Sequence, residues 1–191
     1  MLYRGTVTSN HDAYQSFQVF VKVDGIHLSN KEAIQAEVVG GTDFGLNDGV
    51  GLSSVLRVGT RVWVMFEDED SGNYGKPVVI GVIHEVNDRH PTLQSEYDKA
   101  QVIKTQSGHT ITISDFGGKE RIDIYHKSGT DVLIDNQGNI IIHGVKDFNS
   151  SINGNYSLSV KGNITINSNG TINSTSSSNT NIKGANINLN C

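Results

Sequence analysis

The sequence predicts an all-β protein in which an N-terminal five-stranded barrel is followed by an intertwined homotrimeric triple-stranded β-helix. Three observations lead to this fold class. Apolar and polar residues alternate along several stretches, which is the period of a β-strand. The joins between them are rich in Gly, Asp and Asn, and no long segment has helical spacing. From about Ser150 the chain is mostly Asn, Ser, Thr and Gly with isolated aliphatics, so a packed domain is followed by a different structure.

Residues 1–90 contain the strands expected of the barrel. FQVFVKV and TRVWVMFED alternate, and LYRGTVTSN and KPVVIGVIHEV supply further short strands. The residues expected on the inner face are Phe17, Val19, Val21, Val23, Val62, Val64 and Phe66, opposite Trp63 and Met65. Four or five strands in this length fit an oligonucleotide/oligosaccharide-binding (OB) barrel, with VVGGTDFGLNDGVGLSSVLRVG as a long loop.

Residues 91–104 include the polar stretch QSEYDKAQVIK and are predicted to be a linker. Beyond them, SGHTITISD, ERIDIYHKSGTDVLID and NQGNIIIHG return to alternation, with glycines between the short strands. Residues 105–191 are therefore assigned to the needle-like second part.

An eight-residue repeat is clearest from about residue 152 onward. Gly154, Gly162 and Gly170 lie eight residues apart, whereas Ser178 takes the next position and Gly184 departs from the spacing. One octad makes a strand and a turn, and a complete coil of a single-chain solenoid needs roughly three such units. Residues 151–191 hold about five octads, too few for a repeat structure with a continuous core of its own.

The tail must therefore fold against other chains. The backbone entropy lost on ordering it exceeds what its few aliphatic side chains return when buried. Three copies wound into a triangular prism would bury every aliphatic side chain and pair the strands between chains. The predicted trimer core consists of Leu158, Val160, Ile164, Ile166, Ile172 and Ile182.

Several stretches of the chain together resemble the central spike of contractile-tail phage baseplates. They are VGTRVWVMFEDEDSGNYGKPVVIGVI, TQSGHTITISD, KERIDIYHKSGTDVLIDNQGNIIIHG and the octads. Baseplate assembly protein V and the spike part of VgrG proteins share this architecture. The resemblance implies a structural, non-enzymatic piercing needle of the virion tail baseplate, assembled in the host cytoplasm. It also implies that the OB barrel binds a baseplate hub protein and that the needle transiently meets the host outer membrane.

Two departures from that family concern its enzymatic domain and its tip. Too few residues separate GVIHEV from TQSGHTI for the lysozyme domain that some members carry. Other members end in a His-x-His pair that binds iron, but this chain has no histidine after His143. The expected tip is metal-free and is capped by a PAAR-type protein through Ile187, Leu189, Asn190 and Cys191. The alternative is an end that is frayed or that works uncapped.

Composition and spacing argue against several other kinds of site. A net charge of -5 disfavours nucleic acid, and no signal-peptide-like apolar core precedes the barrel. EDED at residues 67–70 is assigned to a solvated turn rather than a calcium loop, and the histidines share no metal-ligand spacing. No cofactor is expected. Cys191 either meets its two copies on the axis or is incidental.

Two alternative functions stay open from the sequence. One is an OB-fold nucleic-acid-binding protein, which would need a basic groove with spaced aromatic residues. The other is a trimeric fibre that binds or degrades carbohydrate. A fold alone does not decide function. The octads are the feature that favours a load-bearing spike over these alternatives.

Overall fold

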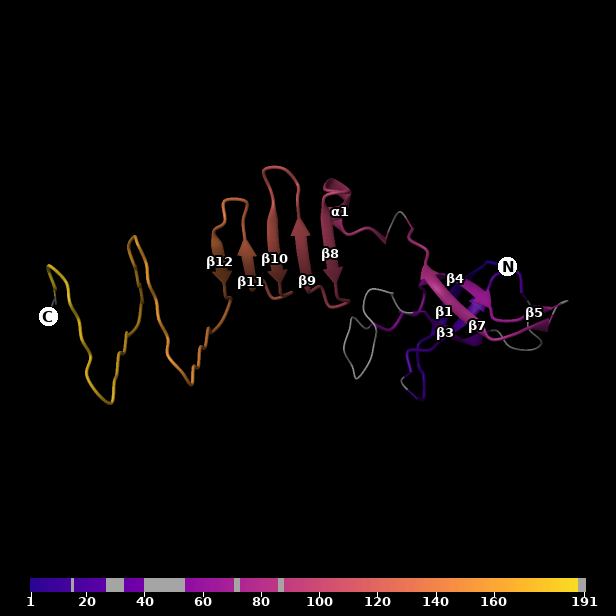
Figure 1. The fold of residues 1–191 in the computed structure, drawn as a ribbon, viewed down its shortest axis with the longest axis horizontal. Coiled ribbons are helices and arrows are strands. Elements are labelled where there is room, and N and C mark those ends of the chain that lie inside the picture. Colours follow the sequence, from indigo (N-terminus) through magenta and orange to yellow (C-terminus); the bar gives the residue numbers. More distant parts are fainter. Residues whose placement is uncertain (15, 27–32, 40–53, 71–72, 86–87, 189–191) are drawn as a thin grey trace. The chain divides into compact units, whose positions relative to one another are not determined.

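The computed structural model describes residues 1–14, 16–26, 33–39, 54–70, 73–85 and 88–188. The protein is all-β with almost no helix, as the sequence predicted. A closed barrel, an open sheet and an extended tail follow one another along the chain (Figure 1). The chain divides into two units between Val145 and Lys146, and each is described by itself.

Five strands close the barrel in the order β1-β2-β3-β7-β4, with β4 pairing back onto β1. They are β1 (Tyr3–Ser9), β2 (Val19–Val23), β3 (Ile34–Val38), β4 (Arg61–Phe66) and β7 (Pro77–Val82). The β3–β7 pair is parallel and the other pairs are antiparallel. This five-stranded arrangement is consistent with an OB-like barrel.

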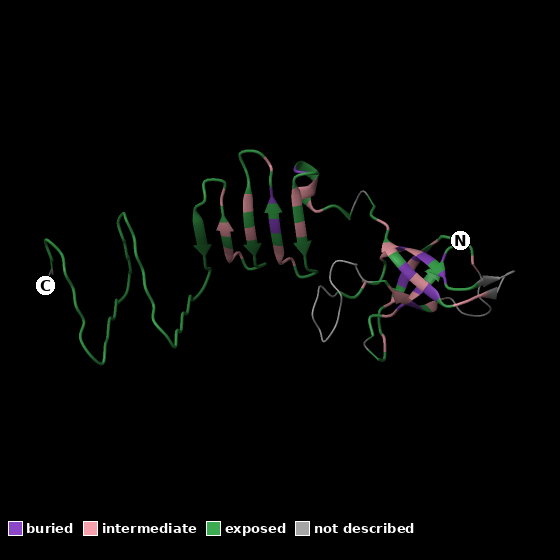
Figure 2. Ribbon diagram, in the orientation of Figure 1, coloured by how far each residue is buried: buried purple, intermediate pink, exposed green. Residues whose placement is uncertain are grey.

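The barrel core is built mainly from valine, a β-branched residue that packs well on a pleated strand. Buried residues alternate with less buried ones along β1, β2, β4 and β7. Figure 2 shows buried residues in the barrel, coloured purple. The fully or nearly fully buried set is Val7, Val19, Val21, Val23, Ala36, Val62, Val64, Phe66 and Val79. The Phe66 ring packs against Tyr3 and Tyr74, with ring centroids 5.6 and 4.9 Å away. The alternation predicted from Val62 to Phe66 is thus confirmed.

Phe17 is not part of this core, contrary to the sequence prediction. Its side chain is 40% exposed and its φ of 62° lies in the left-handed region. The cause is the preceding turn, in which the Asp12 carboxylate accepts hydrogen bonds from the Tyr14 amide and the Ser16 hydroxyl, at 3.0 and 2.6 Å. The alternation therefore begins only at Val19.

A short hairpin carries the EDED sequence between β4 and β7. It pairs β5 (Glu69–Asp70) with β6 (Asn73–Tyr74), so the acidic stretch lies at a hairpin end as expected. Most of the predicted long loop, residues 40–53, falls outside the described residues.

The segment predicted as a linker, residues 91–104, contains a helix and a strand. The helix α1 (Pro91–Ser95) starts at a proline, which is favourable at the first helical position, and His90 caps it. The strand β8 (Ala100–Lys104) opens a five-stranded antiparallel sheet of order β12-β11-β10-β9-β8. The remaining strands are β9 (Thr110–Ser114), β10 (Arg121–Tyr125), β11 (Asp131–Ile134) and β12 (Ile140–His143). The sequence AQVIK of β8 does not alternate, because Val102 and Ile103 are adjacent, and its pairing with β9 shows that it is a strand.

The tail bends at regular eight-residue intervals. Bends lie at residues 145–146, 153–154, 161–162, 169–170 and 177–178, with a further one at 185. The bends follow the octad spacing of the sequence, and they continue past Gly170, where serines replace the glycine. Among residues 146–188 there is no strand, and every residue is exposed (Figure 2).

Candidate functional site

One face of the β8–β12 sheet is almost entirely aliphatic, and we call it the isoleucine face. Its members are Ile103, Ile111, Ile113, Ile122, Ile124, Val132, Ile134, Ile140 and Ile142, which are 37% to 70% exposed. The strand registers align them in two rows. One row runs from Ile103 through Ile111, Ile124 and Val132 to Ile142, and the other from Gln101 through Ile113, Ile122 and Ile134 to Ile140.

An uncharged apolar surface of this kind is unusual on a monomer. Large contiguous apolar patches on soluble proteins mark interaction sites. Burying the exposed half of each side chain would contribute about 1 kcal/mol, or on the order of 10 kcal/mol for the whole face. The isoleucine face is therefore the strongest candidate for a functional surface in the part of the chain that the structure describes.

The opposite face of the sheet mixes polar and apolar residues, with Val102, Leu133 and Ile141 in one row with Thr112 and Asp123, and it is partly covered from the α1 side. Thr112 and Ser114 of β9 are buried there, beside Glu96. Glu96 accepts a 2.6 Å hydrogen bond from the Ser114 hydroxyl, and the Arg121 guanidinium lies 3.1 Å from both carboxylate oxygens. These contacts tie α1 to β9 and β10, and they show that this face is the one already partly covered within the chain.

The hydrogen bond from Ser114, assisted by Arg121, holds the pKa of Glu96 below its usual range, although burial acts in the opposite direction. A carboxyl group with a lowered pKa in the folded state stabilises the protein above its unfolded pKa, about 4.3 for glutamate. That stabilisation is lost as the pH falls through the lowered folded pKa.

We expect Glu96→Gln to lower the free energy of unfolding at pH 7 by about 1–3 kcal/mol, because Arg121 loses its charged partner. Thermal unfolding followed between pH 7 and pH 3 should show the difference from the unmodified chain shrinking below about pH 4.5. Lys99→Gln is the matched control, because its ion pair with Asp98 is exposed. A difference that stays constant across this range would contradict the assignment.

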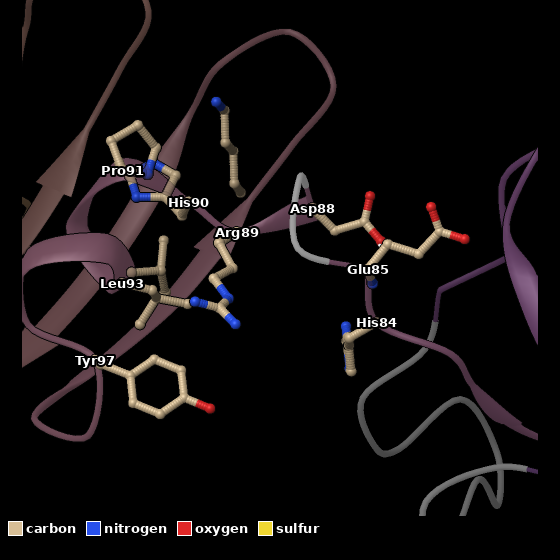
Figure 3. A pocket seen from close by; sticks show the side chains of 10 residues that line it. His84, Glu85, Asp88, Arg89, His90, Pro91, Leu93 and Tyr97 are labelled. Carbon is tan, nitrogen blue, oxygen red and sulfur yellow. Dashed lines mark hydrogen bonds between the residues drawn. The ribbon is translucent and has the colours of Figure 1, made fainter.

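A hollow lies beside α1, and Figure 3 shows its lining. The Arg89 guanidinium lies 5.2 Å from the centre of the Tyr97 ring, and the His90 ring accepts a hydrogen bond from the Thr92 amide. Burial, and secondarily Lys104, lowers the pKa of His90. These contacts stabilise the helix and its entry.

The tail places its apolar residues on a single set of octad positions. Counting each octad from its bend, the third, fifth and seventh positions from Asp147 to Lys183 are all polar. The predicted trimer core falls entirely on even positions: Ile164 and Ile172 on the fourth, Leu158, Ile166 and Ile182 on the sixth, and Val160 on the eighth. All six side chains are exposed in the single chain, between 45% and 72%.

The predicted tip surface is only partly visible. Ile187 is 50% exposed and follows the bend at 185 by two residues, which places it on a third position. The apolar set therefore shifts by one residue in the last octad. Leu189, Asn190 and Cys191 lie outside the described residues.

Sequence reasoning missed two groups of candidate residues. The isoleucine face was not recognised, although each of its strands alternates, because a shared face depends on the registers of four strand pairs. Phe148 and Tyr156 also occupy the fourth octad position, 76% and 74% exposed. Their eight-residue spacing from Ile164 was the available signal.

Comparison with known proteins adds no relative. No family model matches the chain, and no curated protein matches it significantly. Within the described residues, no helix is long and apolar enough to cross a membrane. The same residues contain no group of three or more side chains that could hold a metal ion.

Proposed function

We propose that this protein is the structural, envelope-piercing central spike of a contractile phage tail baseplate or a related injection system. The observation that carries the proposal is the distribution of exposed apolar side chains. The isoleucine face and the even positions of the tail both lack a partner surface among the described residues, and the odd positions of the tail from Asp147 to Lys183 are polar. Exposed apolar side chains in two successive structures, each described by itself, favour an interior that is built from several copies.

Three copies suit this pattern best. Each octad is one short strand and one bend, and a triangular prism is the smallest closed shape with flat walls and bends at its corners. Three isoleucine faces would pack toward the axis, and the even positions of the tail would continue that interior. The polar residues of the odd positions would face water, which agrees with the ordinary burial of aliphatic side chains.

The same arrangement suits a load-bearing needle. The octads from Ser151 to Gly184 carry charge only at Lys161 and Lys183, so in the trimer their walls would be held by backbone hydrogen bonds and apolar contacts rather than by ion pairs. In this proposal the barrel binds the baseplate hub, and the needle meets the host outer membrane transiently. A PAAR-type protein caps the end that begins at Ile187. No catalytic step is assigned to the chain.

The test combines solution mass with location. Light scattering of the purified chain should give about 62 kDa, three times the 20.7 kDa of one chain. An antibody against the barrel should label the baseplate end of contractile particles from producing cells. The tail sheath of the same particles is the negative control and should stay unlabelled. A folded monomer of 20.7 kDa would contradict the trimer. A trimer that shifts labelled single-stranded DNA, or that degrades polysaccharide, would favour one of the two other functions.

A further inference from the structure

Strand β12 leaves an apolar edge on the open sheet. It pairs with β11 on one side and is the last strand of the sheet order. Ile140, Ile141 and Ile142 are 70%, 45% and 57% exposed, and the strand carries no Lys, Asp, Glu or Pro. Natural proteins usually protect an edge with such residues, because an unprotected edge is a template for another strand.

The way the chain turns changes beyond this edge. The turns that join β8 to β12 contain Gly108, Gly118, Gly129 and Gly138 with φ between 77° and 97°, and each returns the chain to pair with the strand before. A positive φ is what tight reversals commonly require. The tail glycines at 154, 162, 170 and 184 do not have positive φ. The tail bends are therefore of a different kind from the hairpin turns of the sheet.

We propose that the free edge of β12 takes residues 147–152 of a neighbouring copy as its next strand, so that pairing within one chain gives way to pairing between chains at this point. This inference rests on the proposed trimer. Every copy leaves its own sheet in the same rotational sense about a three-fold axis. The arriving strand therefore runs in the same direction as β12, and the pair is parallel.

The octad spacing sets the register of this pair. If corners coincide, the bend at 145–146 of one copy lies beside the bend at 153–154 of its neighbour, so partners differ by eight in number. Ile140 then lies beside Phe148 in the interior, and Ile141 lies beside Asn149 on the outside. The inward and outward residues of the two strands match throughout, which a shift of one residue would abolish.

A disulfide test can detect this pairing directly. Neighbouring strands are about 4.8 Å apart, within the Cα separation that a disulfide spans. In full-length chain carrying Cys191→Ser, the double variant Ile141→Cys/Asn149→Cys should form a covalent trimer under oxidised glutathione, resolved by non-reducing electrophoresis. Each copy would link to the next and close a ring of three. Co-refolding the two single variants should give covalent dimers, whereas either variant alone should give none.

The matched control is Ile141→Cys/Ser150→Cys, which puts the second thiol on the opposite face of the arriving strand. The fraction of its chains that become covalently linked should be at least tenfold smaller than for the Ile141→Cys/Asn149→Cys variant after equal oxidation times. Equal linking would overturn the register. The double variant could also be a trimer by light scattering in which the cysteine thiols introduced at positions 141 and 149 stay free or join within one chain. That result would overturn the strand exchange and leave the proposed spike in place. A monomer by light scattering would overturn both.

Discussion

Ile111→Asp is expected to abolish the trimer, whereas Thr110→Asp, one residue earlier on the same strand, should leave it intact. Ile111 belongs to the isoleucine face and lies between Ile103 and Ile124. Thr110 faces the other way, opposite Lys104, where a new carboxylate gains a nearby cation. An unpaired charge in an apolar interior costs several kcal/mol, so three copies would raise the dissociation constant by roughly a millionfold.

This comparison separates packing within a chain from packing between chains. In the single chain Ile111 is 41% exposed and Thr110 is less exposed, so intrachain burial alone predicts no larger effect at Ile111. Light scattering over a range of protein concentrations measures the trimer, and circular dichroism reports whether the barrel remains folded. Equal loss of trimer in both variants would mean that the isoleucine face is not the interface.

The second large effect is expected in the tail. Ile164→Asp or Ile166→Asp should disrupt the needle, whereas Thr165→Asp or Asn167→Asp should be tolerated. Ile164 and Ile166 occupy the fourth and sixth octad positions, and their polar neighbours occupy the fifth and seventh. Each buried carboxylate should cost about 3 kcal/mol or more, repeated in three copies, while a solvated one costs little.

Limited proteolysis read together with solution mass is the measurement for this pair. The tail of an assembled needle should resist cleavage, because its backbone would be hydrogen-bonded, whereas the tail of the isoleucine variants should be cut within residues 146–188. Similar protease sensitivity for the isoleucine and the polar variants would mean that the inside and outside positions of the octads were assigned wrongly.

The strands were largely predictable from the sequence because their signal is local. A period of two in TRVWVMF is enough to place Val62, Val64 and Phe66 on one face, and the structure buries all three. The octad was predictable for the same reason, since Gly154, Gly162 and Gly170 mark it directly. Phe17 fitted the alternating pattern equally well, but a carboxylate five residues earlier holds the turn that removes it from the strand.

The tertiary structure was needed wherever a residue's role depends on a distant partner. Strand β8 lacks alternation because Val102 and Ile103 are adjacent apolar residues, and only its pairing with β9 defines it. The isoleucine face exists because four hairpin turns set registers that bring Ile103, Ile122 and Ile142 onto the same side of the sheet. Alternation decides that a residue faces one of two sides. Which side it shares with its neighbours is decided by turn geometry and hydrogen-bond register, because a slip of one residue would move every side chain to the opposite face.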